Sequence, residues 1–239
     1  FPNSNKSNLL ITCPTFFVPG NLLIDLKKNN NLLIDFRNKE LNNDIYCNTD
    51  YWICSPCPTY KIDKQFLKRF KKIKIIVTPS TGSNHIDVTY CNQNNIKVLT
   101  LKNSSEIKNI TSSSEYTFAM VLASIRNLPT AINYTKKYHW RDIEDNLRSF
   151  ELRDKILGIV GFGRIGSNIF KYSKPFNMKS LVFDPYVKLK KTKDLTQVPK
   201  LEILCKKSDI ICVCVNLTSE TQNLINKKQF SIMKNGVIF

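Results

Sequence analysis

The sequence predicts an α/β fold built on parallel sheets, and two features of the chain carry this prediction. Short apolar runs alternate with amphipathic stretches through residues 9–77, as they do where strands and helices take turns along a chain. Farther on, an apolar run at residues 156–160 leads directly into a glycine-rich turn and a helix-compatible stretch. With 239 residues, of which 42% are hydrophobic, the chain is long enough for two domains with cores of their own.

The first half of the chain contains six candidate elements. Apolar runs stand at residues 9–12, 32–36, 52–54 and 73–77, and amphipathic stretches at residues 21–28 and 64–70. The pentapeptide Asn-Leu-Leu-Ile-Asp occurs twice, at residues 21–25 and 31–35. The first copy follows Pro19 and Gly20 and leads into lysines, which favours a helix, whereas the second is expected to be a strand. Tertiary setting overrides propensity in runs this short, so two copies do not indicate a repeat architecture.

A pair of helices is expected next. Apolar side chains recur at helical spacing within residues 112–127, and Pro129 is expected to interrupt the pattern. A second helix is expected over residues 130–138.

The last third of the chain continues the α/β alternation. After a strand that ends at Asp184 we expect a lysine-rich loop, a helix over 201–206, a strand over 210–215, a helix over 226–233 and a strand beginning at 237. Cys212 and Cys214 are expected to be small apolar residues of a buried strand. Because the final strand would break off at Phe239, we expect a fragment with a C-terminally incomplete fold.

The strongest functional signal is Gly161, Gly163 and Gly166, followed by Asp184, eighteen positions later (184 − 166). In a Rossmann dinucleotide site the first glycine makes the tight turn, the second lets a pyrophosphate approach, and the third lets the helix pack on the sheet. A carboxylate after the second strand accepts hydrogen bonds from the ribose hydroxyls and repels a 2′-phosphate. The sequence therefore predicts a doubly wound parallel sheet that binds NAD rather than NADP.

The start of the helix after these glycines is expected to hold the phosphates. Free N–H groups around Arg164 and Ile165 would face the anion with the helix dipole behind them. The alternative, a glycine turn that binds nothing, is disfavoured because strand, helix and terminal acid accompany the glycines.

Composition argues against several other classes. The net charge is +17, but the lysines are scattered, so we interpret them as solvated surface and expect no nucleic-acid partner. No apolar run approaches the roughly 20 residues that cross a bilayer, so we expect no membrane partner and a cytoplasmic location. Cys54 and Cys57 have C-x-x-C spacing, yet no second pair follows and the chain has only two histidines, so a metal or redox site is not expected.

Several segments resemble the D-isomer-specific 2-hydroxyacid dehydrogenases, a family that includes D-3-phosphoglycerate dehydrogenase. Residues 151–166 resemble the family's E-L-x-G-K-T-L-G-I-I-G-x-G-R-I-G signature, with Asp154 at a usual glycine. Further matches, in family order, lie at residues 80–87, 114–129, 184–186 and 215–226.

The resemblance implies a flavodoxin-like substrate domain over residues 1–110, interdomain helices over 111–149 and an NAD-binding Rossmann domain over 150–239. It places Thr81 and Gly82 in the loop that approaches the substrate carboxylate. His85 and His139 are interpreted as structural. The cofactor-binding residues that it implies are Gly161, Phe162, Gly163, Arg164, Ile165, Gly166, Asp184, Pro185, Val215, Asn216 and Thr221.

The resemblance also implies the activity. Family members interconvert a D-2-hydroxy acid and a 2-keto acid with an arginine and a histidine–glutamate pair, which lie downstream of the segment that residues 233–239 match. We therefore expect the catalytic residues beyond Phe239 and an inactive 239-residue chain. 3-Phosphoglycerate is one candidate substrate, and the full-length protein is expected to be a homodimer. A non-catalytic NAD-sensing module of the same fold is the alternative.

Overall fold

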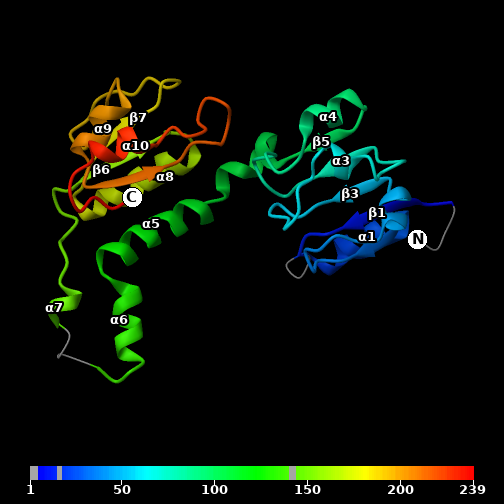
Figure 1. Ribbon diagram of the computed structural model, residues 1–239, viewed down its shortest axis with the longest axis horizontal. Coiled ribbons are helices and arrows are strands. Elements are labelled where there is room, and N and C mark those ends of the chain that lie inside the picture. The colour runs from blue at the N-terminus through cyan, green and yellow to red at the C-terminus, as the bar shows by residue number, and fades with distance from the viewer. Residues whose placement is uncertain (1–4, 15–17, 140–143) are drawn as a thin grey trace. The chain divides into compact units, whose positions relative to one another are not determined.

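The computed structural model describes residues 5–14, 18–139 and 144–239 (Figure 1). The chain divides into two compact units, Phe1–Ile107 and Lys108–Phe239. Each unit has a parallel sheet and a hydrophobic core of its own. None of the helices that the structure describes is long and apolar enough to span a bilayer.

The first unit is a five-stranded sheet in the order β2-β1-β3-β4-β5, with every neighbouring pair parallel. This is the strand order of flavodoxin-like folds. The strands are β1 (Ser7–Ile11), β2 (Asn30–Ile34), β3 (Tyr51–Ile53), β4 (Ile75–Val77) and β5 (Lys97–Leu99). The helices are α1 (Gly20–Asn29), α2 (Asn43–Cys47), α3 (Lys64–Leu67) and α4 (Val88–Gln93).

The repeated pentapeptide takes two different structures. Residues 21–25 lie within α1, and residues 31–35 begin in β2, which pairs with β1 from Ser7↔Asn30 to Ile11↔Ile34. Both predictions for this segment are confirmed. Because the two copies are identical, their surroundings and not their composition select helix or strand.

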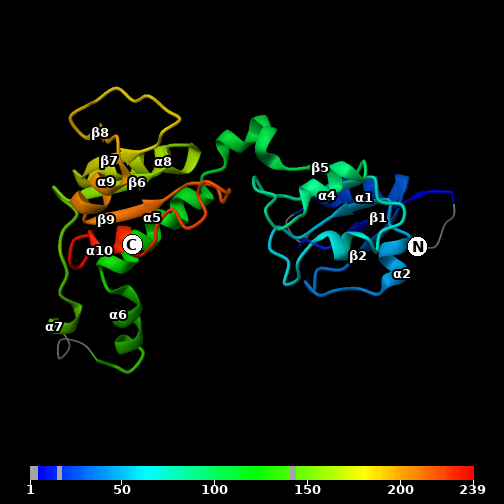
Figure 2. The ribbon, with the colours of Figure 1, turned by 45° about the horizontal axis from the view of Figure 1, so that its top comes forward.

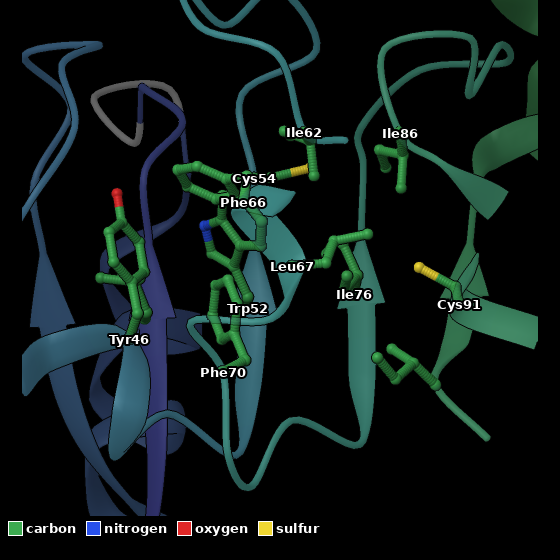
Figure 3. Close-up of a cluster of buried hydrophobic side chains, with 12 residues drawn as sticks. Tyr46, Trp52, Cys54, Ile62, Phe66, Leu67, Phe70, Ile76, Ile86 and Cys91 are labelled. Carbon is green, nitrogen blue, oxygen red and sulfur yellow. The ribbon is translucent and has the colours of Figure 1, made fainter. Parts of the chain in front are cut away.

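An aromatic cluster fills the core of the first unit (Figure 3). Tyr46 and Phe66 meet with ring centroids 5.1 Å apart, and Trp52 stacks on Phe70 at 5.2 Å. The indole N–H of buried Trp52 donates to Thr12 Oγ1 at 2.9 Å, so burial leaves it satisfied. Trp52 belongs to β3, so the cluster packs directly on the sheet.

Three helices precede the second sheet: α5 (Ser112–Ile125), α6 (Leu128–Thr135) and α7 (Glu144–Leu147). Buried Phe118, Val121 and Ile125 share one face of α5, which packs against the second core. The expected break between α5 and α6 is present, but its cause differs. Asn127 has a φ of 48°, and Pro129 lies inside the first turn of α6, where a missing N–H costs nothing.

The second unit carries a parallel sheet in the order β8-β7-β6-β9. Its strands are β6 (Ile156–Val160), β7 (Lys179–Phe183), β8 (Leu195–Gln197) and β9 (Ile210–Val213), and its helices are α8 (Arg164–Ser173), α9 (Leu201–Lys207) and α10 (Lys227–Ser231). Short 3₁₀ turns stand at Leu101–Asn103, Ser105–Asn109 and Lys174–Phe176. Numbered from β6, the order is 3-2-1-4, which is that of the first four strands of a Rossmann sheet, so the predicted fold class is confirmed.

Three details differ from the sequence expectation. β9 ends at Val213, so Cys214 follows the strand, although its N–H still donates to Val160 O at 2.7 Å. The expected lysine-rich loop lies at residues 184–194 (yellow in Figure 2), but it leads into the short strand β8, which the sequence did not predict. The expected last strand is represented by a parallel bridge between Ile238 and Ile210.

Candidate functional site

Two glycines of the turn after β6 are required by their close surroundings. Gly161 has a φ of 89°, and a Cβ there would lie 2.7 Å from Val215 Cγ1. A Cβ on Gly166 would lie 2.1 Å from the carbonyl oxygen of Gly161, because α8 packs directly on the turn. A larger residue at either position must displace backbone or a neighbouring strand end.

Gly163 is different, because its surroundings are open. A Cβ built on it would meet no described atom within 4 Å. It is the N-cap of α8, and no side chain of the described residues caps that helix. The first amides of a helix lack intrahelical partners, so this turn presents backbone donors toward open space. That is the arrangement that receives a phosphate.

Asp184 follows β7 and ties two backbone segments together. Its Oδ2 accepts a hydrogen bond from the N–H of Phe162 at 2.7 Å, and its Oδ1 accepts one from the N–H of Tyr186 at 2.9 Å. The Phe162 ring points into the core, 6.1 Å from the ring of Phe170. The carboxylate therefore stands at the mouth of the glycine turn, with lone pairs left for a further donor.

The exits of β6, β7 and β9 enclose a cavity of about 550 Å³. Its described lining contains two carboxylates and neither lysine nor arginine. The lining residues are Val160, Gly161, Gly163, Phe183, Asp184, Pro185, Tyr186, Cys214, Val215, Asn216, Thr218, Glu220, Thr221 and Leu224. Of the expected cofactor residues, the cavity brings together Gly161, Gly163, Asp184, Pro185, Val215, Asn216 and Thr221.

Four expected cofactor residues lie beside the cavity instead of lining it. Ile165 packs against the second core, and Gly166 is buried at the contact between α8 and the turn. The amide of Phe162 is held by Asp184. The guanidinium of Arg164 donates to the carbonyl oxygen of Ile110. Their side chains shape the turn, and any cofactor contact from Arg164 or Ile165 would come from the backbone.

The wall after β9 is held by its own threonines. Thr221 Oγ1 donates to the carbonyl oxygen of Asn216 at 2.5 Å and accepts from the N–H of Thr218 at 2.8 Å. Sequence reasoning did not assign Tyr186, Thr218 or Glu220 to the site. Their signal was present, because they lie inside the two matching segments at residues 184–186 and 215–226.

The second unit also matches a known family. The family described as "D-isomer specific 2-hydroxyacid dehydrogenase, NAD binding domain" matches residues 118–239. The chain belongs to the D-isomer specific 2-hydroxyacid dehydrogenases. The fold and the cofactor that the sequence predicted are those of this family's NAD-binding domain.

Individual members of the family are similar over much of the chain. The D-3-phosphoglycerate dehydrogenase of Methanocaldococcus jannaschii is 31% identical over 180 residues, which cover 74% of this chain and 33% of that protein. The hydroxypyruvate reductase of Thermotoga maritima is 33% identical over 182 residues, which cover 74% of this chain and 56% of that protein. The chain therefore spans about a third to about half of the length of these relatives.

A solved structure agrees with both units. The D-lactate dehydrogenase from Aquifex aeolicus, complexed with NAD and lactic acid, matches with a TM-score of 0.79 and 30% identity. The match covers 97% of this chain and 67% of that one.

The residues of the second unit fit the family's cofactor. Gly163 is surrounded by open space, the start of α8 has no side-chain cap, and Asp184 lines the cavity. A Rossmann NAD site needs these three features for the pyrophosphate, for its amide donors and for the ribose hydroxyls. A 2-hydroxyacid dehydrogenase binds NAD for hydride transfer, which is chemistry that protein side chains do not supply.

Thr81 and Gly82 lie in the loop that follows β4 in the first unit. Ser80 Oγ donates to the carbonyl oxygen of Gly82 at 2.7 Å, and Thr78 Oγ1 lies 3.0 Å from Ser80 Oγ. His85 Nε2 lies 3.1 Å from Thr78 Oγ1, and burial lowers the pKa of His85. These contacts fix the loop at the carboxyl edge of the sheet, where α/β proteins bind ligands. The structural role expected for His85 stays a prediction.

All eight cysteines lie in the described part of the chain, and each is a free thiol. In the C-x-x-C segment Cys54 is buried and Cys57 is exposed. Burial raises the pKa of Cys54 to about 12, so its thiolate does not form near neutral pH.

Proposed function

We propose that the protein containing this chain is an NAD-dependent oxidoreductase that interconverts a D-2-hydroxy acid and its 2-keto acid by hydride transfer. The observation that carries the proposal is the cavity of about 550 Å³ between the glycine turn and Asp184, in a unit that matches the family's NAD-binding domain. Several similar proteins, among them a D-3-phosphoglycerate dehydrogenase and a hydroxypyruvate reductase, act by name on small hydroxy acids or keto acids, which supports this substrate class. Others are formate dehydrogenases by name.

In this proposal each wall of the cavity has a task. The backbone amides at Gly163, Arg164 and Ile165 hold the pyrophosphate, and Asp184 accepts from the adenosine ribose. Val215, Asn216 and Thr221 border the adenine. Gly161 and Gly166 shape the turn without touching the cofactor through side chains.

The first unit would supply the substrate side. Backbone N–H groups in the loop at Thr81 and Gly82 can hold a carboxylate without an added positive side chain. We assign substrate binding to residues 1–110, the connecting helices to 111–149 and cofactor binding to 150–239. We further propose a cytoplasmic homodimer as the full-length form, and 3-phosphoglycerate as one candidate substrate because D-3-phosphoglycerate dehydrogenases are among the relatives.

Two measurements test the proposal. Calorimetric titration of the 239-residue chain with NADH should show saturable binding. The longer protein that contains the chain should then oxidise NADH when a 2-keto acid such as glyoxylate or hydroxypyruvate is added. Binding without oxidation by any 2-keto acid would favour the NAD-sensing alternative, and a lack of NADH binding would overturn both.

A further inference from the structure

The mouth of the cofactor cavity is spanned by a pair of side chains from two different walls. Tyr186, two residues after Asp184, donates its hydroxyl hydrogen to Glu220 Oε2. Tyr186 belongs to the exit of β7 and Glu220 to the segment after β9, and both line the cavity. The hydrogen bond therefore joins the two walls between which adenosine would lie.

This pair continues a chain of contacts that begins at the glycine turn. The N–H of Phe162 donates to Asp184 Oδ2, the N–H of Tyr186 donates to Asp184 Oδ1, and the Tyr186 hydroxyl reaches Glu220. Both carboxylates thus share Tyr186 as a partner. Their charges act together on its hydroxyl: the hydrogen bond to Glu220, and then the charges of Glu220 and Asp184, raise the pKa of Tyr186.

The charge balance of the cavity is opposite to that of the chain. The chain carries 36 lysines and arginines against 19 acids, yet the described lining holds Asp184 and Glu220 and no cation. Among the described residues, neither carboxylate forms an ion pair. Glu202, by contrast, is paired with Lys228. Two uncompensated carboxylates at one end of the site oppose any ligand that brings a further anion there.

The lysine-rich loop after β7 would act against this repulsion. The loop between β7 and β8 carries Lys188, Lys190, Lys191 and Lys193, and cations after this strand are what accommodate a 2′-phosphate in NADP-binding relatives of the Rossmann fold. All four side chains are exposed, and none lines the cavity. Gln197 holds the base of the loop by donating to the carbonyl oxygens of Asp184 and Val187 at 2.9 and 2.8 Å.

We propose that Glu220 is a second cofactor-specificity residue, which acts with Asp184 to exclude NADP, and that Tyr186 is the positioning residue that holds Glu220 across the adenosine mouth. This inference rests on the proposed NAD site. It assigns to Glu220 the repulsion of the 2′-phosphate, which carries up to about two negative charges near neutral pH. The lysine-rich loop attracts anions in general but does not reverse the preference for NAD over NADP.

The test is the ratio of the dissociation constants for NADPH and NADH, measured by calorimetry on the full 239-residue chain. Glu220→Gln keeps a hydrogen-bond acceptor for Tyr186 and removes the charge, so the ratio should fall roughly tenfold at low ionic strength. Glu151→Gln removes one exposed carboxylate of the same unit that does not line the cavity, and it serves as the matched control. Added salt should narrow the difference in this ratio between wild type and Glu220→Gln, because salt screens the charge of an exposed residue such as Glu220.

Tyr186→Phe separates positioning from charge. It removes the hydroxyl and keeps the ring, so the ratio should fall by less than in Glu220→Gln. Adding Tyr186→Phe to Glu220→Gln should give the same ratio as Glu220→Gln alone, because Tyr186 then has no charge to position. Thermal melting of each variant verifies that the fold is retained.

The outcomes separate the inference from the proposed function. If the wild-type chain binds neither cofactor, both are wrong. If NADH binds but Glu220→Gln and Glu151→Gln give the same ratio, the NAD site stands and the role of Glu220 is refuted. If the wild-type chain binds NADPH as tightly as NADH, the lysine-rich loop outweighs the two carboxylates and the inference is again refuted.

Discussion

Asp184 Oδ2 lies 2.7 Å from the backbone nitrogen of Phe162 and accepts its hydrogen bond. The end of β7 is thereby attached to the glycine turn that follows β6. One carboxylate sets the position of the turn and faces the cavity at the same time. In the proposed NAD site, the acid that would accept from the ribose therefore also positions the amides that would hold the pyrophosphate.

This double role predicts the effect of Asp184→Ala. We expect at least roughly tenfold weaker NADH binding and a smaller preference for NADH over NADPH, because both the acceptor and the repelling charge are lost. Parallel calorimetric titrations with the two cofactors measure this. Unchanged curves for both cofactors would remove Asp184 from the site.

The two glycines at the start of α8 are expected to respond in opposite ways. Gly163→Val places a side chain into open space, so the fold should persist while NADH binding is lost. Gly166→Ala forces a Cβ to within 2.1 Å of the Gly161 carbonyl oxygen, so the free energy of unfolding should fall by about 1–3 kcal/mol or more. Urea unfolding and NADH titration of both variants measure this difference. Retained NADH affinity in Gly163→Val would refute the close approach of a ligand to that turn.

Asp209 is expected to make the second unit sensitive to acid. Its Oδ2 accepts from the N–H of Ile156 at 2.8 Å, and its Oδ1 accepts from Lys234 Nζ at 2.7 Å. Partial burial raises the pKa of Asp209, but the donated hydrogen bond from Ile156 and the Lys234 ammonium together lower it below its ordinary value. A carboxyl with a lowered folded-state pKa stabilises the fold above its unfolded pKa of about 3.9, and this contribution is lost as pH falls through the folded value.

Asp209→Asn should therefore lower the free energy of unfolding by about 1 kcal/mol near neutral pH. The difference between wild type and variant should shrink once the pH lies below the folded-state pKa of Asp209. Urea unfolding at neutral and acidic pH measures it. A difference that is the same at both pH values would show that the charge of Asp209 is not involved.

The two cores are expected to behave separately. Phe66 is 6% exposed in the aromatic cluster of the first unit, and Phe66→Ala should cost about 3–5 kcal/mol of that unit's stability. The second unit has its own buried clusters, so NADH affinity should remain that of the wild type. Urea unfolding followed by Trp52 fluorescence in a Trp140→Phe background, together with NADH titration, measures both effects. Loss of NADH binding in this variant would show that the units depend on each other.

Much of the fold could be predicted because its signals are local. The glycines at 161, 163 and 166 have the spacing of one turn and one helix start, and the structure places the turn there. The two copies of Asn-Leu-Leu-Ile-Asp were distinguished by what precedes and follows each one. By contrast, β8 (Leu195–Gln197) is three residues long and contains Thr196 and Gln197, so no apolar pattern marks it.

The site was less predictable where contacts join distant segments. Tyr186 and Glu220 are 34 residues apart, and neither residue type indicates a ligand by itself. Their meeting depends on β9 lying beside β6 and on the form of the loop after β7. The bond from Phe162 to Asp184 likewise spans 22 residues, so its double role could not be derived from spacing alone.

The most direct measurement is calorimetric titration of the folded 239-residue chain with NADH, beside its Gly163→Val variant. We predict saturable, one-to-one binding by the wild-type chain and none by the variant at equal stability. A wild-type chain that stays folded and takes up no NADH, or a variant that binds as well as wild type, would contradict the assignment of this turn as the cofactor site.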